Sequence, residues 1–267
     1  MKLLFSEAKP DYPHYIFPYA VWAFPEPGEK PSDLFAQGFL PSSRDLDRFY
    51  LARQVRVALE RFKLSSENRR ILRKGDGITA SLVPRHKFDY SSGRREFYKD
   101  YADKKFGKDI MSYDRLDALF QGRITSHVLI FTDPSSGAEV GTVTLYLESN
   151  TLAYYYYAFY DLNYYGRNLG MYMMTYAVNF LAREGLSFLY LGSCYLGNAL
   201  YKTQFAGAEF FNGVHWSKNI EELKYLVRRG QQEQSRHLLE SQEYRETFYD
   251  QELPAIATRS TFSVRIK

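Results

Sequence analysis

A turn bounded by two glycines runs directly into a long helical pattern. The turn occupies residues 166–170, with the sequence GRNLG, and Met171 and Tyr172 follow it. Backbone N–H groups at a helix start lack partners, and the helix dipole favours negative charge there. We therefore expect Arg167, Asn168 and Gly170 to contact an anionic part of a substrate. The alternative is a glycine-assisted turn between a strand and a helix.

A second candidate binding site is a basic segment of the chain. Residues 44–74 contain ten Lys or Arg and four Asp or Glu, while the net charge of the whole chain is only +4. Within them, the run SSENRRILRKGDG predicts a serine cap, a short basic helix and a glycine stop. The helical spacing places Arg69 and Arg73 on one face, with Arg70 beside them. Such a stripe favours a polyanionic partner, and a solvated basic face is the alternative.

Four consecutive tyrosines, at positions 154–157, occupy a predicted central strand. Alternate residues of a strand face opposite sides of the sheet, so one pair should face the core and the other a groove. The groove-facing pair could stack a terminal adenine of an RNA. Simple filling of the core is the alternative.

The composition limits the classes of protein. Of the 267 residues, 45% are hydrophobic and 25% are charged, which is typical of a globular chain. The single cysteine, Cys194, excludes an intramolecular disulfide and a multi-cysteine metal site, and we expect it to be buried. The histidines have no ligand spacing, so we expect no metal. Because no apolar run approaches a membrane span, we expect a soluble cytoplasmic protein without a membrane partner.

The predicted elements set the positions of these residues. We expect an irregular packed segment with a short strand at 1–35. A long strand at 49–62 should then place Leu51, Val55, Val57 and Leu59 on one face. The remaining predictions are helices at 91–107 and 112–122, a β meander at 126–132, 138–148 and 151–160, the helix after the glycine turn, a parallel strand at 186–192, a helix at 198–207, a strand at 208–216, a helical pattern at 219–252 and a strand at 259–266.

This order resembles that of the GNAT acyltransferases, in which a mixed sheet splays open and the acyl donor lies in the notch. We therefore expect an α+β fold with a GNAT-like mixed, splayed β-sheet flanked by helices, preceded by an N-terminal α+β segment. In acetyl-CoA-using GNAT enzymes the turn has the pattern R/Q-x-x-G-x-G/A. Here the last position is Tyr172, whose ring should hinder the close approach of a pyrophosphate.

Three blocks resemble the arginyl- and leucyl-tRNA–protein transferases of the N-end rule. The block RNLGMY, at 167–172, is similar to their R-S-L-G-x-Y/F stretch. The block at 185–216 matches a segment that contains L-G and Y-K-x-x-F-x-P-x-E, and FKLSSENRRILRK, at 62–74, matches F-x-x-S-x-S-Q-R-R-x-x-R-K/R-N. In order, the resemblance covers about residues 34–216.

Some positions depart from this family pattern. The family's amino-terminal cysteine motifs are missing, Asn68 stands in place of Gln, and Gly75 stands in place of Asn. The stretch AGAE, at 206–209, replaces R-P-L-E. The resemblance divides the chain into an N-terminal basic strand and helix region at 1–88, a GNAT-like aminoacyltransferase domain at 89–216 and a C-terminal helical extension at 217–267.

The resemblance implies an arginyltransferase-like reaction. The free α-amine of an acceptor protein, with Asp or Glu as its first residue, would attack the ester of an aminoacyl-tRNA and receive arginine or leucine. Because the ester is already activated, the resemblance implies no cofactor beyond the aminoacyl-tRNA co-substrate. The site must align the reactants, keep the amine neutral and stabilise developing negative charge.

The resemblance also implies roles for individual residues. Tyr201 would pass a proton to the leaving oxygen, Lys202 would lie beside it, and Glu209 would take the proton of the amine or hold its ammonium form. The structural alternatives are packing for Tyr201, solvation for Lys202 and an arginine pair for Glu209. The residues expected to bind substrate are Arg69, Arg70, Arg73, Arg167, Asn168, Gly170 and Tyr172. The cluster of Arg69, Arg70 and Arg73 would bind either tRNA or the acidic N-terminus of an acceptor.

Two other functions stay open. A CoA-dependent N-acyltransferase would hold pyrophosphate at 167–170 and use Tyr201 as the acid for the thiolate. Tyr172 and the basic cluster at 69–74 argue against it. The departures at Asn68, Gly75 and AGAE suggest a third possibility, a relative that binds tRNA or protein and has lost activity.

Overall fold

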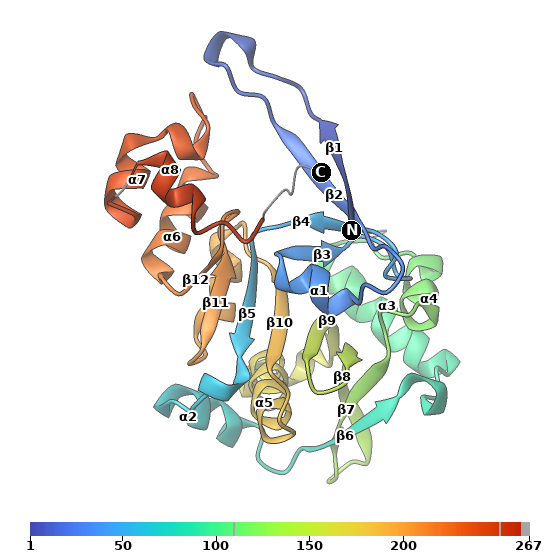
Figure 1. Cartoon of the computed structure of the whole chain (residues 1–267). Coiled ribbons are helices and arrows are strands. Elements are labelled where there is room, and N and C mark those ends of the chain that lie inside the picture. The colour runs from blue at the N-terminus through green and yellow to red at the C-terminus, as the bar shows by residue number, and fades with distance from the viewer. Residues whose placement is uncertain (109, 251, 263–267) are drawn as a thin grey trace.

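Two β-sheets organise the chain in a computed structural model that describes residues 1–108, 110–250 and 252–262 (Figure 1). The larger sheet has the strand order β12-β11-β5-β10-β9-β8-β7-β6, and the smaller has the order β1-β2-β4-β3. The larger sheet consists of β5 (Gln54–Ala58), β6 (Thr79–Pro84), β7 (His127–Asp133), β8 (Ala138–Glu148), β9 (Leu152–Tyr160), β10 (Phe188–Ser193), β11 (Ala208–Phe211) and β12 (Trp216–Ser217).

The smaller sheet and the helices surround this larger sheet. The smaller sheet consists of β1 (Lys2–Glu7), β2 (Tyr19–Phe24), β3 (Phe39–Pro41) and β4 (Phe49–Leu51). The α-helices are α1 (Pro31–Ala36), α2 (Ser66–Lys74), α3 (Ser92–Phe106), α4 (Tyr113–Gln121), α5 (Leu169–Arg183), α6 (Ile220–Arg229), α7 (Gln242–Phe248) and α8 (Leu253–Ala257). A 3-10 helix, η5 (Gly197–Thr203), follows β10.

One parallel pair interrupts an otherwise antiparallel sheet. β9 and β10 run in the same direction, and α5 connects them as a crossover. Their pairing covers only three positions and ends at Tyr154 and Tyr190. Beyond that point β9 pairs with β8 alone, while β10 bulges between Tyr190 and Gly192 and follows β5. The expected GNAT-like α+β fold with a mixed sheet that splays at its centre is confirmed.

Apolar side chains fill both faces of the larger sheet. On one face, Met173, Ala177 and Val178 of α5 are fully buried together with Leu129 and Leu189. The opposite face is covered by two further clusters, because successive strand residues point to opposite sides. One of these clusters joins the smaller sheet and α1 to the larger sheet, and the other joins α3 and α4 to β7 and β9.

The meander and most helices agree with the predictions, and capping explains why. Ser65, Ser91 and Ser112 each accept a hydrogen bond from a backbone N–H in the first turn of α2, α3 and α4. Glycine follows each of these three helices directly, at positions 75, 107 and 122. The parallel orientation predicted for the strand at 186–192 is also confirmed.

Several predicted boundaries differ from the structure. The strand expected at 49–62 is divided into β4 and β5, because the chain passes from one sheet to the other at Ala52 and Arg53. Val55, Val57 and Leu59 nevertheless share one buried cluster, as predicted, whereas Leu51 packs in another.

Other segments also differ in type. The segment at 1–35, expected to be irregular with one short strand, contains two strands, β1 and β2, and most of α1. The helix expected at 198–207 is the 3-10 helix η5, and the strand expected at 208–216 is the pair β11 and β12. β6 was not predicted. Of the strand expected at 259–266, residues 263–266 lie outside the described residues, and 259–262 form no strand.

Strands from both sides of residue 88 form the larger sheet. β5 lies between β11 and β10, and β6 forms the edge beside β7. The region expected at 1–88 therefore supplies a central strand to the same sheet as residues 89–216. No helix of the described residues is long and apolar enough to cross a membrane.

Candidate active site

A cavity of about 450 Å³ opens where β9 and β10 separate, and we call it the notch cavity. Side chains from both faces of the larger sheet contribute to it, because the splay leaves a gap between the two strands. Its lining comprises 155–158 and Tyr160 of β9, 168–171 and Met174 at the start of α5, Leu191 of β10, Tyr201 and Lys202 of η5, and Tyr101, Lys105 and Phe106 of α3. Of the predicted site residues, the structure thus brings Asn168, Gly170, Tyr201 and Lys202 together.

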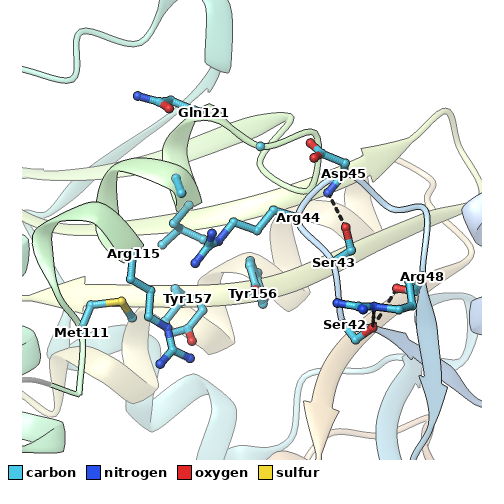
Figure 2. Close-up of a pocket in the computed structure, with 13 residues that line it drawn as sticks. Ser42, Ser43, Arg44, Asp45, Arg48, Met111, Arg115, Gln121, Tyr156 and Tyr157 are labelled. Atoms are coloured by element: carbon cyan, nitrogen blue, oxygen red, sulfur yellow. Dashed lines mark hydrogen bonds between the residues drawn. The ribbon is translucent and has the colours of Figure 1, made fainter. Parts of the chain in front are cut away.

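The four tyrosines at 154–157 contribute to the core and also to the walls of two cavities. Tyr154 and Tyr155 are 6% exposed, and burial raises the pKa of both phenols well above the ordinary value. Tyr156 and Tyr157 are half-buried and line the notch cavity together with a neighbouring cavity (Figure 2). Tyr155 lines the notch cavity as well, so the predicted division into alternate core-facing and groove-facing pairs is not observed. A β-bulge in β9 disturbs the alternation, because Leu145 pairs with Tyr155 and Thr144 pairs with Tyr157, which leaves Tyr156 as the extra residue.

Lys202 lies inside the notch with its amine held in place. Its Nζ donates a hydrogen bond of 2.8 Å to the backbone oxygen of Ser193, at the end of β10. Burial lowers the pKa of the Lys202 amine from its ordinary value of 10.5, because desolvation penalises the charged form. A larger fraction of this amine is therefore neutral near pH 8 than for a solvated lysine.

Tyr201 borders the opening of the same cavity and is 45% exposed. Partial burial raises the pKa of its phenol, and the neighbouring Tyr160 acts in the same direction. The phenol therefore stays protonated at neutral pH and can donate a hydrogen bond or a proton. Tyr201 and Lys202 are adjacent on η5, which follows directly from the end of β10.

A close contact with Tyr160 explains why residue 170 is a glycine. A Cβ atom at this position would lie 2.8 Å from the Tyr160 hydroxyl and 2.9 Å from the nearest ring atoms. The tyrosine ring therefore lies directly against the backbone at the first turn of α5. The phenol covers the part of the helix start that an anion would need to approach.

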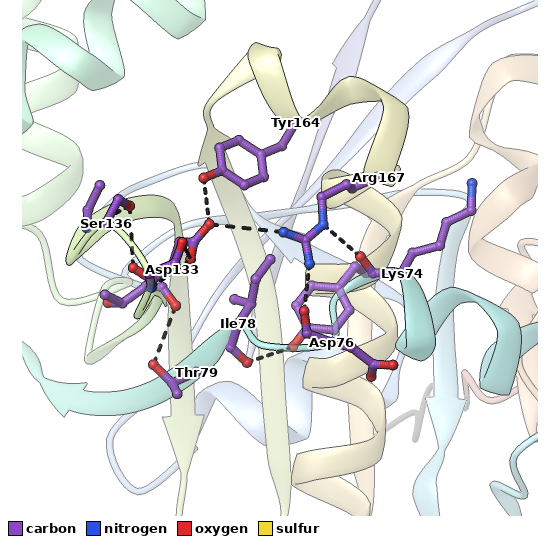
Figure 3. A network of polar contacts seen from close by, with 12 residues as sticks. Lys74, Asp76, Ile78, Thr79, Asp133, Ser136, Tyr164 and Arg167 are labelled. Carbon is purple, nitrogen blue, oxygen red and sulfur yellow. Dashed lines mark hydrogen bonds and ion pairs between the residues drawn. The ribbon is translucent and has the colours of Figure 1, made fainter.

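Arg167 joins two helices and does not line the notch (Figure 3). Its Nε donates to the Lys74 oxygen at 3.0 Å, and its Nη2 donates to the Asp76 oxygen at 2.6 Å. Its Nη1 also lies 4.0 Å from Oδ2 of Asp133. The guanidinium thus satisfies backbone carbonyls after the end of α2, which accounts for this residue without a substrate.

Tyr172 was expected to face the substrate at the glycine turn, but it lies elsewhere. Its ring is 4% exposed and packs edge to face against Phe131. A Cβ at Gly75 would lie 2.0 Å from a ring carbon of Tyr172, so the ring lies directly on that glycine. Tyr172 therefore points into the core between α2 and α5, and Tyr160 is the phenol that covers the helix start.

The arginines of α2 lie outside the notch. Arg69, Arg70 and Arg73 are exposed on α2, which packs against α5 through Ile71 and Leu72. Arg70 forms a bidentate pair with Glu67, at 2.7 and 2.6 Å. Arg69 donates to the Leu64 oxygen at 2.7 Å. The cluster is thus a solvent-facing basic surface and not a wall of the cavity.

Glu209 forms ion pairs with two arginines. It lies opposite Arg56 in the register of β11 and β5, and Nη2 of Arg56 is 2.8 Å from Oε2 of Glu209. Arg61 contacts the other carboxylate oxygen. Arg56 in turn stacks over the rings of Trp216 and Phe188. The structure does not bring Glu209 to the notch, since its neighbour Phe210 packs on the α5 face and alternation directs Glu209 away from it.

Several lining residues were not identified from the sequence. Tyr160, Met171, Met174 and Leu191 face the notch, although each fits an ordinary core pattern. The only sequence signal was the position of Tyr160 at the end of the tyrosine-rich strand and just before the glycine turn. Contact across the splay decides which of these side chains face the cavity.

Neither of the remaining candidates forms a reactive centre. Cys194 is fully buried, as expected, and burial raises the pKa of its thiol. In residues 1–108, 110–250 and 252–262, no group of three or more His, Cys, Asp or Glu side chains is arranged to hold a metal ion.

Comparison with known proteins gives one sequence relative. An aspartate/glutamate leucyltransferase from Alkalilimnicola ehrlichii is 26% identical over 196 residues, which cover 69% of this chain and 80% of the relative. The resemblance to the aminoacyl-tRNA–protein transferases inferred from the three sequence blocks is confirmed by this relative. No protein-family model matches the sequence.

The similarity to solved structures is lower. FemX has a TM-score of 0.46 at 11% identity and covers 67% of this chain and 65% of its own. L-PGS from Bacillus licheniformis has a TM-score of 0.42 at 12% identity, with 55% and 46% covered. A GCN5-related N-acetyltransferase from Sphaerobacter thermophilus has a TM-score of 0.37 at 14% identity, with 72% and 56% covered. This chain spans less than two thirds of the length of each of these solved chains.

Proposed function

We propose that this relative of the aspartate/glutamate leucyltransferases transfers an amino acid from an aminoacyl-tRNA to the N-terminal α-amine of acceptor proteins that begin with Asp or Glu. The observation that carries the proposal is the sequence relative, whose match covers 80% of its length. The notch supplies a site of suitable chemistry, with a protonated phenol at Tyr201 and an amine of lowered pKa at Lys202.

The chemistry of the notch favours leucine over arginine as the amino acid transferred. Met171, Met174 and Leu191 provide apolar surface, and the described residues that line the cavity include no Asp or Glu. An arginyl group would enter beside Lys105 without a carboxylate partner among the described lining residues, which is unfavourable in a partly buried site. A leucyl group would gain from the apolar contacts.

Two side chains would then act on the reaction. The neutral amine of Lys202 would accept a proton from the attacking α-ammonium group, directly or through a water. As the C–N bond forms and the ester C–O bond breaks, the phenol of Tyr201 would pass its proton to the leaving ribose oxygen and regain one from the attacking nitrogen, which becomes the amide. Beyond Tyr154 the edge of β9 is released from β10, so its backbone groups are available to align the aminoacyl ester.

The position of Tyr160 argues against the CoA-dependent alternative. Pyrophosphate would need the helix start at Gly170, and the Tyr160 ring lies against that backbone. A rearrangement of this partly buried side chain would have to precede binding.

The test is a transfer assay with separately charged tRNAs. We expect labelled leucine to pass from leucyl-tRNA to a peptide with N-terminal Asp, and labelled arginine to pass more slowly or not at all. Acetyl-CoA binding by calorimetry, without transfer from any charged tRNA, would contradict the proposal. Salt-sensitive tRNA binding without transfer would instead indicate the inactive relative.

A further inference from the structure

A second cavity lies beside the notch, and its volume is about 590 Å³. We call it the arginine cavity, because Arg44, Arg48 and Arg115 line it and Asp45 is its single acidic lining residue (Figure 2). Arg44, Asp45 and Arg48 belong to the segment between β3 and β4, and Arg115 belongs to α4. Segments far apart in the sequence thus place three guanidinium groups around one space.

Two of these guanidinium groups form no ion pair with any residue that the structure describes. Among the described residues, no carboxylate lies within ion-pair distance of Arg44 or Arg115. Arg115 donates only to the Ile110 oxygen, at 3.1 Å. Arg48 is different, because its Nε donates to Oγ of Ser42 and its guanidinium lies over the Trp22 ring. Arg44 and Arg115 therefore have donors to spare for an incoming anion.

The floor of the arginine cavity is made by Tyr156 and Tyr157, next to Arg44 and Arg115 in Figure 2. Burial raises the pKa of the Tyr156 phenol to about 12, while the positive charges of Arg44 and Arg115 oppose that rise. Both arginines are thus close enough to act on one phenol. That phenol is protonated and can donate a hydrogen bond to an anion.

The same two tyrosines also line the notch, so the two cavities meet at β9. In an N-terminal Asp or Glu, only two or three carbon atoms separate the side-chain carboxylate carbon from the α-amine. A carboxylate in the arginine cavity would therefore leave the α-amine at the boundary with the notch. A planar carboxylate also suits the forked donors of guanidinium groups.

We propose that the arginine cavity binds the side-chain carboxylate of the acceptor's acidic N-terminal residue, through the guanidinium groups of Arg44 and Arg115. This assignment rests on the proposed function and gives it a basis for selecting acidic acceptors. Residues in the notch act on the amine, and residues in the arginine cavity select the side chain beside it.

A peptide fits this cavity better than an RNA phosphate. Asp45 lies on the lining, where it would repel a chain that carries a charge on every unit. The exposed arginines of α2 offer a nucleic acid a basic surface on which Glu67, the acid of the first turn, is already paired with Arg70. A single carboxylate needs only the guanidinium groups of Arg44 and Arg115.

The experiment measures peptide binding without tRNA. Calorimetry would compare a peptide with N-terminal Asp to the same peptide with N-terminal Asn, on the full chain. We expect the Asp peptide to bind the unmodified protein about ten-fold more tightly or better, as a charged hydrogen bond provides. Arg44→Gln and Arg115→Gln should each remove most of this discrimination, and Arg115→Lys should keep part of it.

Arg183→Gln is the matched control, because Arg183 is exposed at the end of α5 and lines neither cavity. Thermal unfolding of each variant would show that the fold is retained. Unchanged discrimination in both Arg44→Gln and Arg115→Gln would overturn the inference. So would a loss of tRNA affinity in these variants with peptide discrimination intact, because the cavity would then be an RNA site.

The outcomes also separate this inference from the proposed function. Equal kcat/KM for acceptors with N-terminal Asp and Asn would overturn the inference while transfer itself stands. Absence of transfer from every charged tRNA, with Asp binding that both variants lose, would overturn the function while the carboxylate site stands.

Discussion

At the scale of single residues, Glu209 shows how a candidate catalytic acid becomes a structural one. Its carboxylate lies between Arg56 and Arg61, and the side chains of Glu209 and Arg56 are only 7% and 11% exposed. A buried guanidinium without its carboxylate is expensive, so the pair is required once either charge is buried.

We predict that Glu209→Ala lowers the free energy of unfolding by about 3–5 kcal/mol, because it leaves Arg56 unpaired in the core. Glu209→Gln should cost less, because the amide still accepts a hydrogen bond. Urea unfolding measures both. Glu221→Gln is the control, since its pair with Lys224 is exposed and should change stability by less than about 1 kcal/mol. A stable Glu209→Gln variant without transfer activity would restore the catalytic role.

Lys202 gives the second prediction at this scale. Its pKa is lowered by burial, so transfer should rise with pH through that lowered pKa as the amine becomes neutral. The guanidinium of Lys202→Arg stays charged at every pH measured. We therefore expect this variant to lose the rise of kcat/KM with pH and to be about 100-fold less active or worse. Tyr201→Phe should lower kcat while the rise with pH remains. A normal profile in Lys202→Arg would show that the amine only anchors the end of β10.

The same lowered pKa has a consequence for stability. Between the folded-state pKa and 10.5 the unfolded chain binds more protons than the folded chain, so stability contributed at Lys202 rises with pH across that window. Lys202→Met should flatten the rise in urea midpoints measured over the same range. Lys224→Met, which removes an exposed lysine, should leave it unchanged.

At the scale of elements, the contact between α2 and α5 explains one departure from the family pattern, Gly75 in place of Asn. The ring of Tyr172 lies on the backbone of Gly75, and Arg167 donates to the backbone carbonyls of Lys74 and Asp76 at the end of α2. With the Tyr172 ring in this position, a side chain at residue 75 would overlap with it. Packing against α5 therefore accounts for the glycine without a loss of function.

This contact predicts that Gly75→Ala destabilises the fold by about 1–3 kcal/mol, because the new Cβ overpacks against the ring. In a Tyr172→Ala background the same substitution should cost little, which a double-mutant cycle in urea measures. Gly93→Ala is the control, since nothing lies within 4 Å of its Cβ position in α3. Additive costs of the two substitutions would contradict the contact.

At the scale of the whole molecule, basic charge and catalytic chemistry occupy different regions. The exposed arginines of α2 lie outside both cavities, while Lys202 and Tyr201 lie within the notch. A tRNA is large enough to contact a basic surface and place its aminoacyl end elsewhere. We therefore assign α2 to binding the body of the RNA in the proposed function.

Accordingly, Arg69→Gln and Arg73→Gln should weaken tRNA binding and lower the slope of log affinity against log salt by about 0.7–0.9 for each lost contact. Filter binding over a range of salt concentrations measures this slope. Arg70→Gln is a matched comparison with a smaller expected effect, because Glu67 already neutralises Arg70. A slope unchanged in all three variants would exclude α2 from the RNA contact.

Periodicity and turn chemistry determined much of the fold from sequence alone. The alternation at 138–148, the serine cap before α2, the glycine stops of α3 and α4, and the helix after the glycine turn are local patterns, so they were found at nearly the correct residues. The adjacent pair Tyr201 and Lys202 was also found, because it lies within a contiguous motif of the family. Such features can be predicted from the sequence because they depend on residues that are neighbours along the chain.

Only the tertiary structure decided which side chains meet. Arg56 pairs with Glu209, Tyr160 lies against Gly170, and Arg44 and Arg115 line one cavity. Each of these arrangements joins segments that tertiary packing brings together. The direction of Tyr172 depends on α2 packing against α5, and the division of β4 from β5 depends on a second sheet. Such contacts arise from long-range packing, which leaves no periodic signal along the chain.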